Sequence, residues 1–266
     1  MKRAVALTIA GSDSCGGAGI EADIKTMSAL GVYGAVAVTS VTAQNTLGVS
    51  ESLHLSPGMV AAQVDAVLDD IHVDAAKTGM LATVGTIEVV AERILSRSLE
   101  KVVVDPVMVA TSGARLMRED AVEALKSRLL PRALVLTPNI AESSVLAGFD
   151  VDGREAMAKA GEAIRAMGPR YVLVKGGHLD GPAADVLCSG DGPEWFEAER
   201  VGAGKVHGTG CTLSAAIASH LARGRGVRES VGLAKRYVTR CIESGLGIGR
   251  GSLLLDHLAA DGGGAQ

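Results

Sequence analysis

The chain has 266 residues, a formal net charge of −4 and a hydrophobic content of 47%. Charges of both signs are interspersed, so the sequence predicts neither a basic nucleic-acid-binding surface nor an acidic disordered tail. No apolar run is long enough to span a bilayer. The short apolar stretch 4–10 leads into a polar loop without a cleavage pattern, so we expect a buried strand there and not a signal peptide. The cysteines, at positions 15, 188, 211 and 241, have no paired spacing, which favours a reducing cytoplasm over disulfides or a zinc site.

Segments typical of strands and of helices alternate along the chain. Strands are predicted at residues 4–10, 35–41, 73–77, 101–105, 133–137 and 171–175, with a short hairpin within 185–200. Helices are predicted at residues 18–30, 56–70, 84–97, 118–130, 141–147, 154–167, 211–222 and 227–244. Continuous apolar strands separated by helices indicate an α/β fold with a mostly parallel sheet and helices on both faces. We expect residues 1–260 to form a single domain and residues 261–266 to form a flexible tail.

Segments rich in glycine and polar residues follow most of the predicted strands. In open α/β sheets, ligands bind beyond the carboxyl ends of the strands. The segments expected at this rim are 11–19, 42–46, 78–81, 105–113, 138–142 and 176–178. The sequence therefore predicts a ligand site built from loops that are far apart in the chain.

The strongest single motif is His207-Gly208-Thr209-Gly210-Cys211-Thr212, which directly precedes a predicted helix. Its small residues allow consecutive backbone N–H groups to converge, and the positive end of the helix dipole favours an anion at that point. The motif is not a P-loop, because no Gly-Lys-Ser/Thr follows the glycines, and segment 11–19 lacks the dinucleotide-binding spacing. Many glycine-rich turns before helices bind nothing, but this six-residue context favours a site for a transferring phosphoryl group.

Eight segments together resemble the bacterial hydroxymethylpyrimidine/phosphomethylpyrimidine kinases. They follow the order of that family: Ala-Gly-Ser-Asp-Ser at 10–14, Gly-Gly-Ala-Gly at 16–19, Thr-Ala-Gln-Asn-Thr at 42–46, Lys-Thr-Gly-Met-Leu at 77–81, Asp-Pro-Val-Met at 105–108, Thr-Pro-Asn-Ile-Ala-Glu at 137–142, Val-Lys-Gly-Gly-His at 174–178 and the motif at 207–212. The resemblance implies a ribokinase-like fold, with a three-layer α/β/α arrangement around a central, mostly parallel sheet. It also implies two ATP-dependent phosphorylations that convert hydroxymethylpyrimidine to its diphosphate for thiamine biosynthesis.

The resemblance assigns the pyrimidine pocket to Gly11, Asp23, Gln44, Met80 and Val107. Gln44 suits an aminopyrimidine because its amide offers both a donor and an acceptor. Taken alone, Gln44 could simply satisfy the backbone of a loop, Asp23 could be a solvated carboxylate on a helix, and Met80 could equally belong to the core. The family motifs, and not the residue types, therefore carry these predictions.

The resemblance also implies contacts to ATP or its phosphates from Asp105, Asn139, Lys175, Thr209 and Gly210. Glu142, with Asp105, is expected to position Mg²⁺ through water, because this hard cation takes oxygen ligands and retains waters. The alternative for Asn139 and Glu142 is a capping box, with Asn139 as the N-cap and Glu142 at the third helical position. The two roles are compatible. The helix predicted at 227–244, which carries Lys235, is expected to border the adenine.

The predicted catalytic residues are Gly208, Thr209, Gly210, Cys211 and Lys175. Ribokinase relatives usually place an aspartate base where this chain has Cys211. A helix N-terminus lowers the pKa of a cysteine, and the loose transition state of phosphoryl transfer places a modest demand on the base. We also formulate a charge hypothesis for this position. The second acceptor is already an anionic phosphate, which a thiol tolerates and a fixed carboxylate would repel.

Two other functions remain open from the sequence. A pyridoxal kinase of the same superfamily would phosphorylate a similar flat heterocycle, and a non-catalytic pyrimidine-binding protein could share the fold. Residues Lys205-Val206 and the segment 249–253 depart from the family pattern, which bears on nucleotide preference. The family resemblance further implies a cytoplasmic homodimer, with contacts near 32–34 or 49–55, and leaves open whether a monovalent cation assists.

Overall fold

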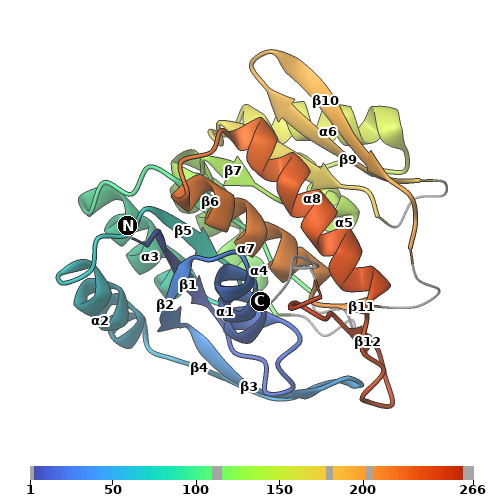
Figure 1. The fold of residues 1–266 in the computed structure, drawn as a ribbon. Coiled ribbons are helices and arrows are strands. Elements are labelled where there is room, and N and C mark those ends of the chain that lie inside the picture. The colour runs from blue at the N-terminus through green and yellow to red at the C-terminus, as the bar shows by residue number, and fades with distance from the viewer. Residues whose placement is uncertain (1–2, 110–115, 178–181, 202–205, 260–266) are drawn as a thin grey trace.

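The computed structural model describes residues 3–109, 116–177, 182–201 and 206–259 (Figure 1). Its central sheet has eight strands: β1 (Val5–Ala10), β2 (Tyr33–Val38), β5 (Ala75–Thr78), β6 (Val102–Val104), β7 (Val135–Leu136), β8 (Tyr171–Lys175), β9 (Ala183–Ser189) and β10 (Gly192–Ala198). Their spatial order is β10-β9-β8-β7-β6-β5-β1-β2. The six strands β8, β7, β6, β5, β1 and β2 run parallel to one another. At the other edge, β9 and β10 form an antiparallel hairpin. The predicted hairpin within 185–200 is thereby confirmed.

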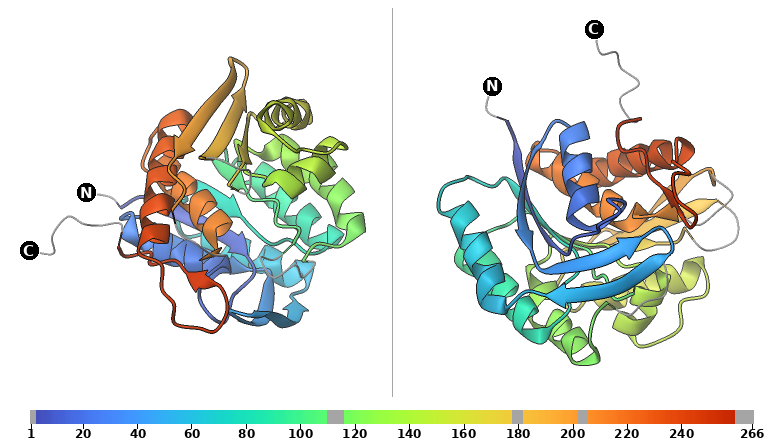
Figure 2. Two further views of the ribbon diagram at one scale, coloured as in Figure 1. Left: turned by 90° about the vertical axis from the view of Figure 1, so that its right-hand side faces the viewer. Right: turned by 90° about the horizontal axis from the view of Figure 1, so that it is seen from below.

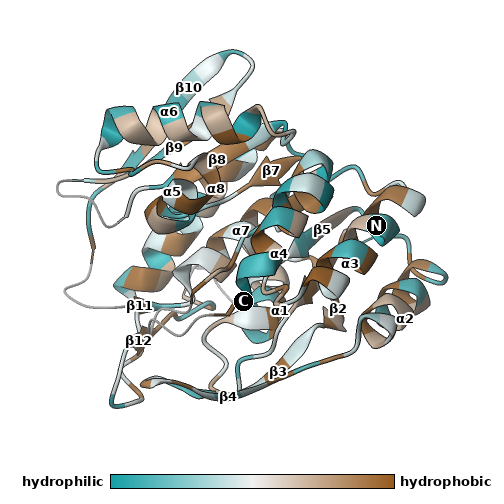
Figure 3. Ribbon diagram, turned by 180° about the vertical axis from the view of Figure 1, so that it is seen from behind, coloured by the Kyte–Doolittle hydropathy of each residue, from teal (hydrophilic) through white to brown (hydrophobic). Residues whose placement is uncertain are grey.

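The helices form two layers around this sheet. They are α1 (Gly19–Ala29), α2 (Pro57–Leu68), α3 (Val84–Ser96), α4 (Glu119–Ala124), α5 (Ile140–Ala147), α6 (Arg154–Arg165), α7 (Thr209–Ala222) and α8 (Val227–Glu243). One apolar cluster packs Met27 of α1, Leu213 of α7 and Val231 of α8 against one face of the sheet. A second cluster joins the opposite face to α2–α6. Figure 3 views this second layer, whose outer helix surfaces carry hydrophilic residues. The predicted three-layer α/β/α fold is confirmed.

The central strands have continuous apolar sequences because both of their faces are covered. The β1 sequence VALTIA and the β6 sequence VVV are buried along their whole lengths. The scarcity of aromatic residues, 2% of the chain, is consistent with a core made mainly of Ala, Val, Leu and Ile. This rigid sheet places the carboxyl ends of its parallel strands along one edge.

A separate hairpin, β3 (Ser40–Asn45) and β4 (Gly48–His54), lies outside the central sheet. Figure 2, in its right-hand view, shows the hairpin crossing the end of the molecule. The predicted loop 42–46 is therefore wrong, because most of this segment belongs to a strand. The turn forms because the Asn45 side-chain oxygen accepts N–H bonds from Leu47 and Gly48. The hairpin holds Gln44 on an antiparallel strand.

Several local predictions can be compared with the structure. Ser56 caps α2, with its Oγ accepting the Met59 N–H, as predicted. The helix predicted at 118–130 is instead α4 followed by a π-helical turn at Leu125–Leu129 and a 3₁₀ turn at Leu130–Arg132, because Pro131 cannot continue the α-helical bonds. Short strands β11 (Val206–His207) and β12 (Leu253–Leu254) pair near the C-terminus. The tail predicted at 261–266 lies outside the described residues. Within those residues, no helix has both the length and the apolar character needed to cross a bilayer.

Candidate active site

The glycine motif forms the turn that precedes α7. Gly208 is left-handed, with φ of 85°, and α7 begins at Thr209. A Cβ on Gly208 would overlap the carbonyl oxygen of Gly17, so the turn and the first loop are in close contact. Only glycine combines this φ with this approach. The first-turn N–H groups of α7, on Thr209, Gly210 and Cys211, have no helical partner and are suited to an anion.

Lys175, at the end of β8, lies beside this turn. Its Nζ is 2.9 Å from Asp105 Oδ1, and a Cβ added to Gly210 would lie 3.2 Å from the same Nζ. Asp105 follows β6 and also receives hydrogen bonds from Thr137 and, at 3.4 Å, from Ser214 of α7. The structure thus brings together the predicted residues Lys175, Asp105 and Gly210. The ammonium lies where it can reach an anion held by the turn.

Asn139 and Glu142 form the predicted capping box. Asn139 Oδ1 accepts the Glu142 N–H at 2.8 Å, and Glu142 Oε2 accepts the Asn139 N–H at 2.8 Å. Glu142 is buried, and burial is the main cause that raises its pKa to about 7; Lys175 opposes this effect and Asp105 adds to it. Glu142 therefore belongs to the same electrostatic cluster as Lys175 and Asp105. The capping role predicted as an alternative is confirmed, and it leaves the carboxylate next to this cluster.

Gln44 reaches the turn before α7 through His207. The Gln44 side-chain Nε2 lies 2.9 Å from His207 Nε2, and His207 immediately precedes Gly208. Residues 163 positions apart in the chain are thus in contact. The strand β3 and the loop before α7 place the predicted pyrimidine-binding amide beside the predicted phosphate site.

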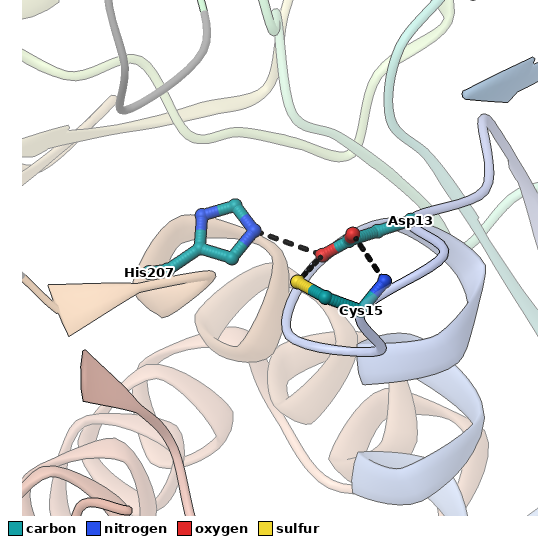
Figure 4. A group of neighbouring side chains, drawn as sticks. All are labelled: Asp13, Cys15 and His207. Atoms are coloured by element: carbon teal, nitrogen blue, oxygen red, sulfur yellow. Dashed lines mark hydrogen bonds and ion pairs between the residues drawn. The ribbon is translucent and has the colours of Figure 1, made fainter. Parts of the chain in front are cut away.

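Asp13 fixes the loop that lies over this turn. Its carboxylate accepts N–H bonds from Cys15, Gly17 and Ala18, and His207 Nε2 lies 2.8 Å from its Oδ2 (Figure 4). Burial opposes the ionisation of Asp13, but the bonds from His207 and Cys15 outweigh it and lower the pKa to about 2. Ligand atoms of Asp13, Cys15 and His207 lie within 4.8 Å of one another. Since the Asp13 carboxylate already accepts these bonds, we assign the three residues a role in holding the loop and not in binding a metal ion.

Asp23 is paired with a buried lysine beneath the rim. It is fully buried on α1, and both carboxylate oxygens bind Lys77 Nζ, at 2.8 and 2.9 Å, while Thr8 Oγ1 donates to it at 2.6 Å. The reason is that Lys77 sits within the buried strand β5, where its charge requires a partner. Asp23 is therefore held by Lys77 and Thr8 beneath the rim, and its predicted contact with the substrate stays a prediction.

Gly11, Met80 and Val107 lie on three neighbouring segments of the rim. A Cβ on Gly11 would clash with the Met80 side chain, so these two residues are in contact. Met80 is buried, and Val107 is half-buried in the loop after β6. The structure brings Gly11 and Met80 together beside Ser40, at the start of the strand that carries Gln44.

The phosphomethylpyrimidine kinase family model matches residues 13–256. The chain belongs to this family. The hydroxymethylpyrimidine/phosphomethylpyrimidine kinase of Rhizobium meliloti is 52% identical over 254 residues, covering 93% of this chain and 95% of that protein. The thiamine biosynthesis bifunctional protein ThiED of Geobacter sulfurreducens is 46% identical over 259 residues, and these span 97% of this chain but about half, 53%, of that protein. Among solved structures, an ADP complex of Bacillus subtilis pyridoxal kinase matches with a TM-score of 0.92 and 39% identity, covering 97% of this chain and 98% of that one.

The pKa of the Cys211 thiol in this kinase differs from its predicted direction. Cys211 is half-buried at the start of α7. Burial raises its pKa to about 11, and the nearby Lys77 opposes this effect only in part. The prediction that the helix N-terminus lowers this pKa is therefore wrong, because desolvation outweighs the helix dipole. The thiol is neutral near pH 7. Cys15, Cys188 and Cys241 are also free thiols, as predicted.

Three residues of the kinase site were not assigned individual roles from the sequence. Asp13 was a part of the first motif, and an aspartate before a Cys-Gly-Gly run is a signal for side-chain capping of a turn. Lys77 is the charged residue of the buried strand β5, and a buried charge indicates a partner. The contact between His207 and Gln44 has no local signal, because it depends on how distant segments fold together.

Proposed function

We propose that this kinase transfers the γ-phosphate of ATP to hydroxymethylpyrimidine and then phosphorylates the monophosphate to the diphosphate, as a step of thiamine biosynthesis. The observation that carries the proposal is the contact between His207 and Gln44, which joins a phosphate-binding turn to a pyrimidine-binding amide. Gly11, Met80 and Val107 would line the ring's pocket. Asp23 would contribute indirectly. It would hold the Lys77 ammonium in place near Cys211.

The nucleotide has a groove of suitable size next to the site. A cavity of about 450 Å³ lies between β10 and α8 and is lined by Phe196, Lys235 and Arg236, among others. Lys235 Nζ binds Asp185 Oδ2 at 2.6 Å, and Asp185 Oδ1 accepts the N–H of Gly176, the residue after Lys175. This chain of contacts connects the groove to the phosphate site. We infer that the adenosine occupies the groove and that its phosphates extend towards Asn139 and the turn before α7.

Magnesium fits the carboxylate pair Asp105 and Glu142 through water. Asp105 Oδ1 is bound by Lys175, and the Glu142 oxygens accept the N–H groups of Asn139 and, at 3.4 Å, Met108, so direct coordination would displace existing partners. Both carboxylates retain lone pairs for water ligands of a hard cation. The bound ion would supply positive charge for the triphosphate. The protein contributes the fixed carboxylates, the Lys175 ammonium and the amides of the turn.

Activity at saturating ATP is expected to rise as the pH increases through about 7. Glu142, whose pKa is raised to about 7, must lose its proton to attract the metal. The same raised pKa makes the contribution of Glu142 to folding stability fall as the pH rises from 4.5 to about 7, because the folded state keeps a proton that the unfolded chain releases.

The Glu142→Gln variant retains the cap. It is expected to remove the rise of activity with pH and to weaken the apparent Mg²⁺ affinity ~10–100-fold. Magnesium titrations of initial rate between pH 5.5 and 8.5 measure both effects. An unchanged pH profile in Glu142→Gln would assign the limb to another group.

Cys211→Asp is expected to slow the second phosphorylation ~10-fold more than the first. A carboxylate at the start of α7 repels the phosphate acceptor of the second step, whereas the first acceptor is uncharged. Single-turnover rates with hydroxymethylpyrimidine and with its monophosphate give the two values. Cys211→Ser is the matched control, because a neutral hydroxyl should slow both steps by the same factor. Equal slowing by Cys211→Asp would refute the charge explanation, and near-normal turnover of Cys211→Ser would show that the thiol only packs the helix.

The direct test of the function measures ADP formation with three acceptors: hydroxymethylpyrimidine, its monophosphate and pyridoxal. The proposal predicts turnover of the first two. Pyridoxal is included because the Bacillus subtilis pyridoxal kinase shares the fold at 39% identity. Turnover of pyridoxal alone would support a pyridoxal kinase. Pyrimidine binding by calorimetry without turnover of any acceptor would support the non-catalytic alternative.

The β3–β4 hairpin offers a surface for a second copy of the chain. Val41 is 49% exposed and Leu53 is 67% exposed, and they are directly paired across the hairpin. Tyr33 on the edge strand β2 is also exposed. We infer a homodimer through this region, in a cytoplasm that keeps the thiols reduced. Light scattering should give the mass of two chains, and Leu53→Glu should give that of one. Leu258→Glu, at another exposed leucine, is the control and should remain dimeric; a monomeric parent chain would contradict the inference.

A further inference from the structure

One nitrogen of His207 faces two side chains. His207 Nε2 lies 2.8 Å from Asp13 Oδ2 and 2.9 Å from the side-chain amide of Gln44. His207 and Asp13 are both buried. Asp13 is ionised near pH 7, since its pKa is lowered to about 2. An ionised carboxylate only accepts hydrogen bonds, so His207 Nε2 must carry a proton and donate it to Asp13 (Figure 4).

The protonated Nε2 limits the orientation of the Gln44 amide. A nitrogen that donates its proton has no lone pair to offer to an amide N–H. The amide oxygen of Gln44, in contrast, can share the Nε2 proton with Asp13. Rotating the amide by half a turn exchanges its oxygen and nitrogen without changing its shape. His207 therefore favours the orientation in which the oxygen of Gln44 faces the ring.

The second neighbour of the Gln44 amide favours the same orientation. Thr42 Oγ1 lies 3.4 Å from the end of the amide that faces away from His207. This hydroxyl already donates its single proton to the backbone oxygen of Ser12, at 2.8 Å. It can therefore only accept from Gln44, which calls for the NH₂ end of the amide on that side. Two independent contacts thus agree on one orientation.

We propose that His207 is a positioning residue that sets substrate selectivity: held by Asp13, it fixes the Gln44 amide with its NH₂ end towards the substrate. The amide then donates to an acceptor such as a pyrimidine ring nitrogen. Pyridoxal carries one ring nitrogen where a pyrimidine carries two, so it offers a fixed donor fewer ring acceptors. A site whose donor is fixed discriminates strongly against a ligand that leaves it poorly paired. The proposal rests on the proposed contact between Gln44 and the pyrimidine.

His207→Phe is the sharpest test, because the flat phenyl ring can pack against Gly17 but has no nitrogen to donate to Asp13 or Gln44. Asp13 keeps its backbone partners in this variant. We expect the ratio of kcat/KM for hydroxymethylpyrimidine to that for pyridoxal to fall ~10-fold, the effect of about one hydrogen bond. KM for the pyrimidine should rise, and kcat at saturation should change much less. His257→Phe is the matched control, since His257 is also buried and bonded to α7, through Thr212, and it should leave the ratio unchanged.

Gln44→Ala separates the two levels of the proposal. It should lose the same selectivity, and His207→Phe added to Gln44→Ala should lower the ratio no further. If Gln44→Ala keeps the parent ratio, the proposed Gln44 contact is wrong, and the role of His207 falls with it. If Gln44→Ala loses selectivity but His207→Phe keeps it, only the role of His207 is overturned. Equal losses of kcat for both substrates with a lower melting temperature in His207→Phe would show a merely structural role and would also overturn it.

Discussion

Replacing Gly208 with alanine is expected to lower kcat ~100–1000-fold, the effect of losing a preorganised backbone donor at a reacting group. The left-handed φ of 85° costs an alanine about 1–2 kcal/mol. The added Cβ would also overlap the Gly17 carbonyl, so the turn must move away from the first loop. The N–H groups of Thr209, Gly210 and Cys211 would then no longer converge on one point. Steady-state kinetics with hydroxymethylpyrimidine measure the loss.

Gly224→Ala is the matched control for this variant. Gly224 also follows a left-handed path, with φ of 83°, but it lies after the C-terminal end of α7 and no atom would lie within 4 Å of its Cβ. Both variants carry a similar backbone cost, and only Gly208→Ala adds the overlap with Gly17, so thermal unfolding should show the larger loss for Gly208→Ala. Only Gly208→Ala should lose turnover. Comparable kcat values for the two variants would mean that the turn before α7 does not hold the phosphoryl group.

Replacing Lys175 with methionine is expected to lower kcat ~1000-fold, because positive charge beside the transferring phosphoryl group is a main source of the rate. The variant also leaves Asp105 without its ammonium partner, which costs about 3–5 kcal/mol of folding stability for a buried pair. Lys175 lowers the pKa of Glu142, so its removal should move the acid limb of the pH profile to higher pH. Kinetics from pH 6 to 9 record both changes.

The double variant Lys175→Met, Asp105→Asn keeps this prediction testable if the single variant unfolds. It removes both charges of the pair, so stability should recover while turnover stays low. Lys101→Met is the control at the opposite end of the strands, where Lys101 precedes β6 and its Nζ donates to the Leu221 carbonyl. It should turn over substrate at the parent rate. Recovery of turnover in the double variant would show that Lys175 serves only to neutralise Asp105.

The parts of the site that the sequence predicted are those with a local physical signal. The turn before α7 follows from glycines that precede an apolar-periodic helix, and α7 begins within this motif, at Thr209. The capping box is visible in the spacing of Asn139 and Glu142. The layered fold follows from continuous apolar strands such as 102–104, which only a sheet covered on both faces explains.

The parts that the sequence did not predict depend on contacts between distant segments or on burial. Asp23 was predicted as a substrate contact, and the buried Lys77 that pairs with it lies 54 residues away in the chain. The β3–β4 hairpin was missed because its polar strands follow the edge strand β2 with almost no break. The pKa of Cys211 was predicted in the wrong direction, because helix position is visible in a sequence and desolvation is not.

The central claim is that backbone amides at the start of α7 hold the transferring phosphoryl group next to the heterocycle bound by Gln44. A crystal structure with hydroxymethylpyrimidine and a non-hydrolysable ATP analogue tests it most directly. We predict the terminal phosphate within hydrogen-bonding distance of the N–H groups of residues 209–211, with the substrate hydroxyl beside it and the ring against Gln44. A nucleotide bound with this turn empty, or a pyrimidine bound away from Gln44, would contradict the claim.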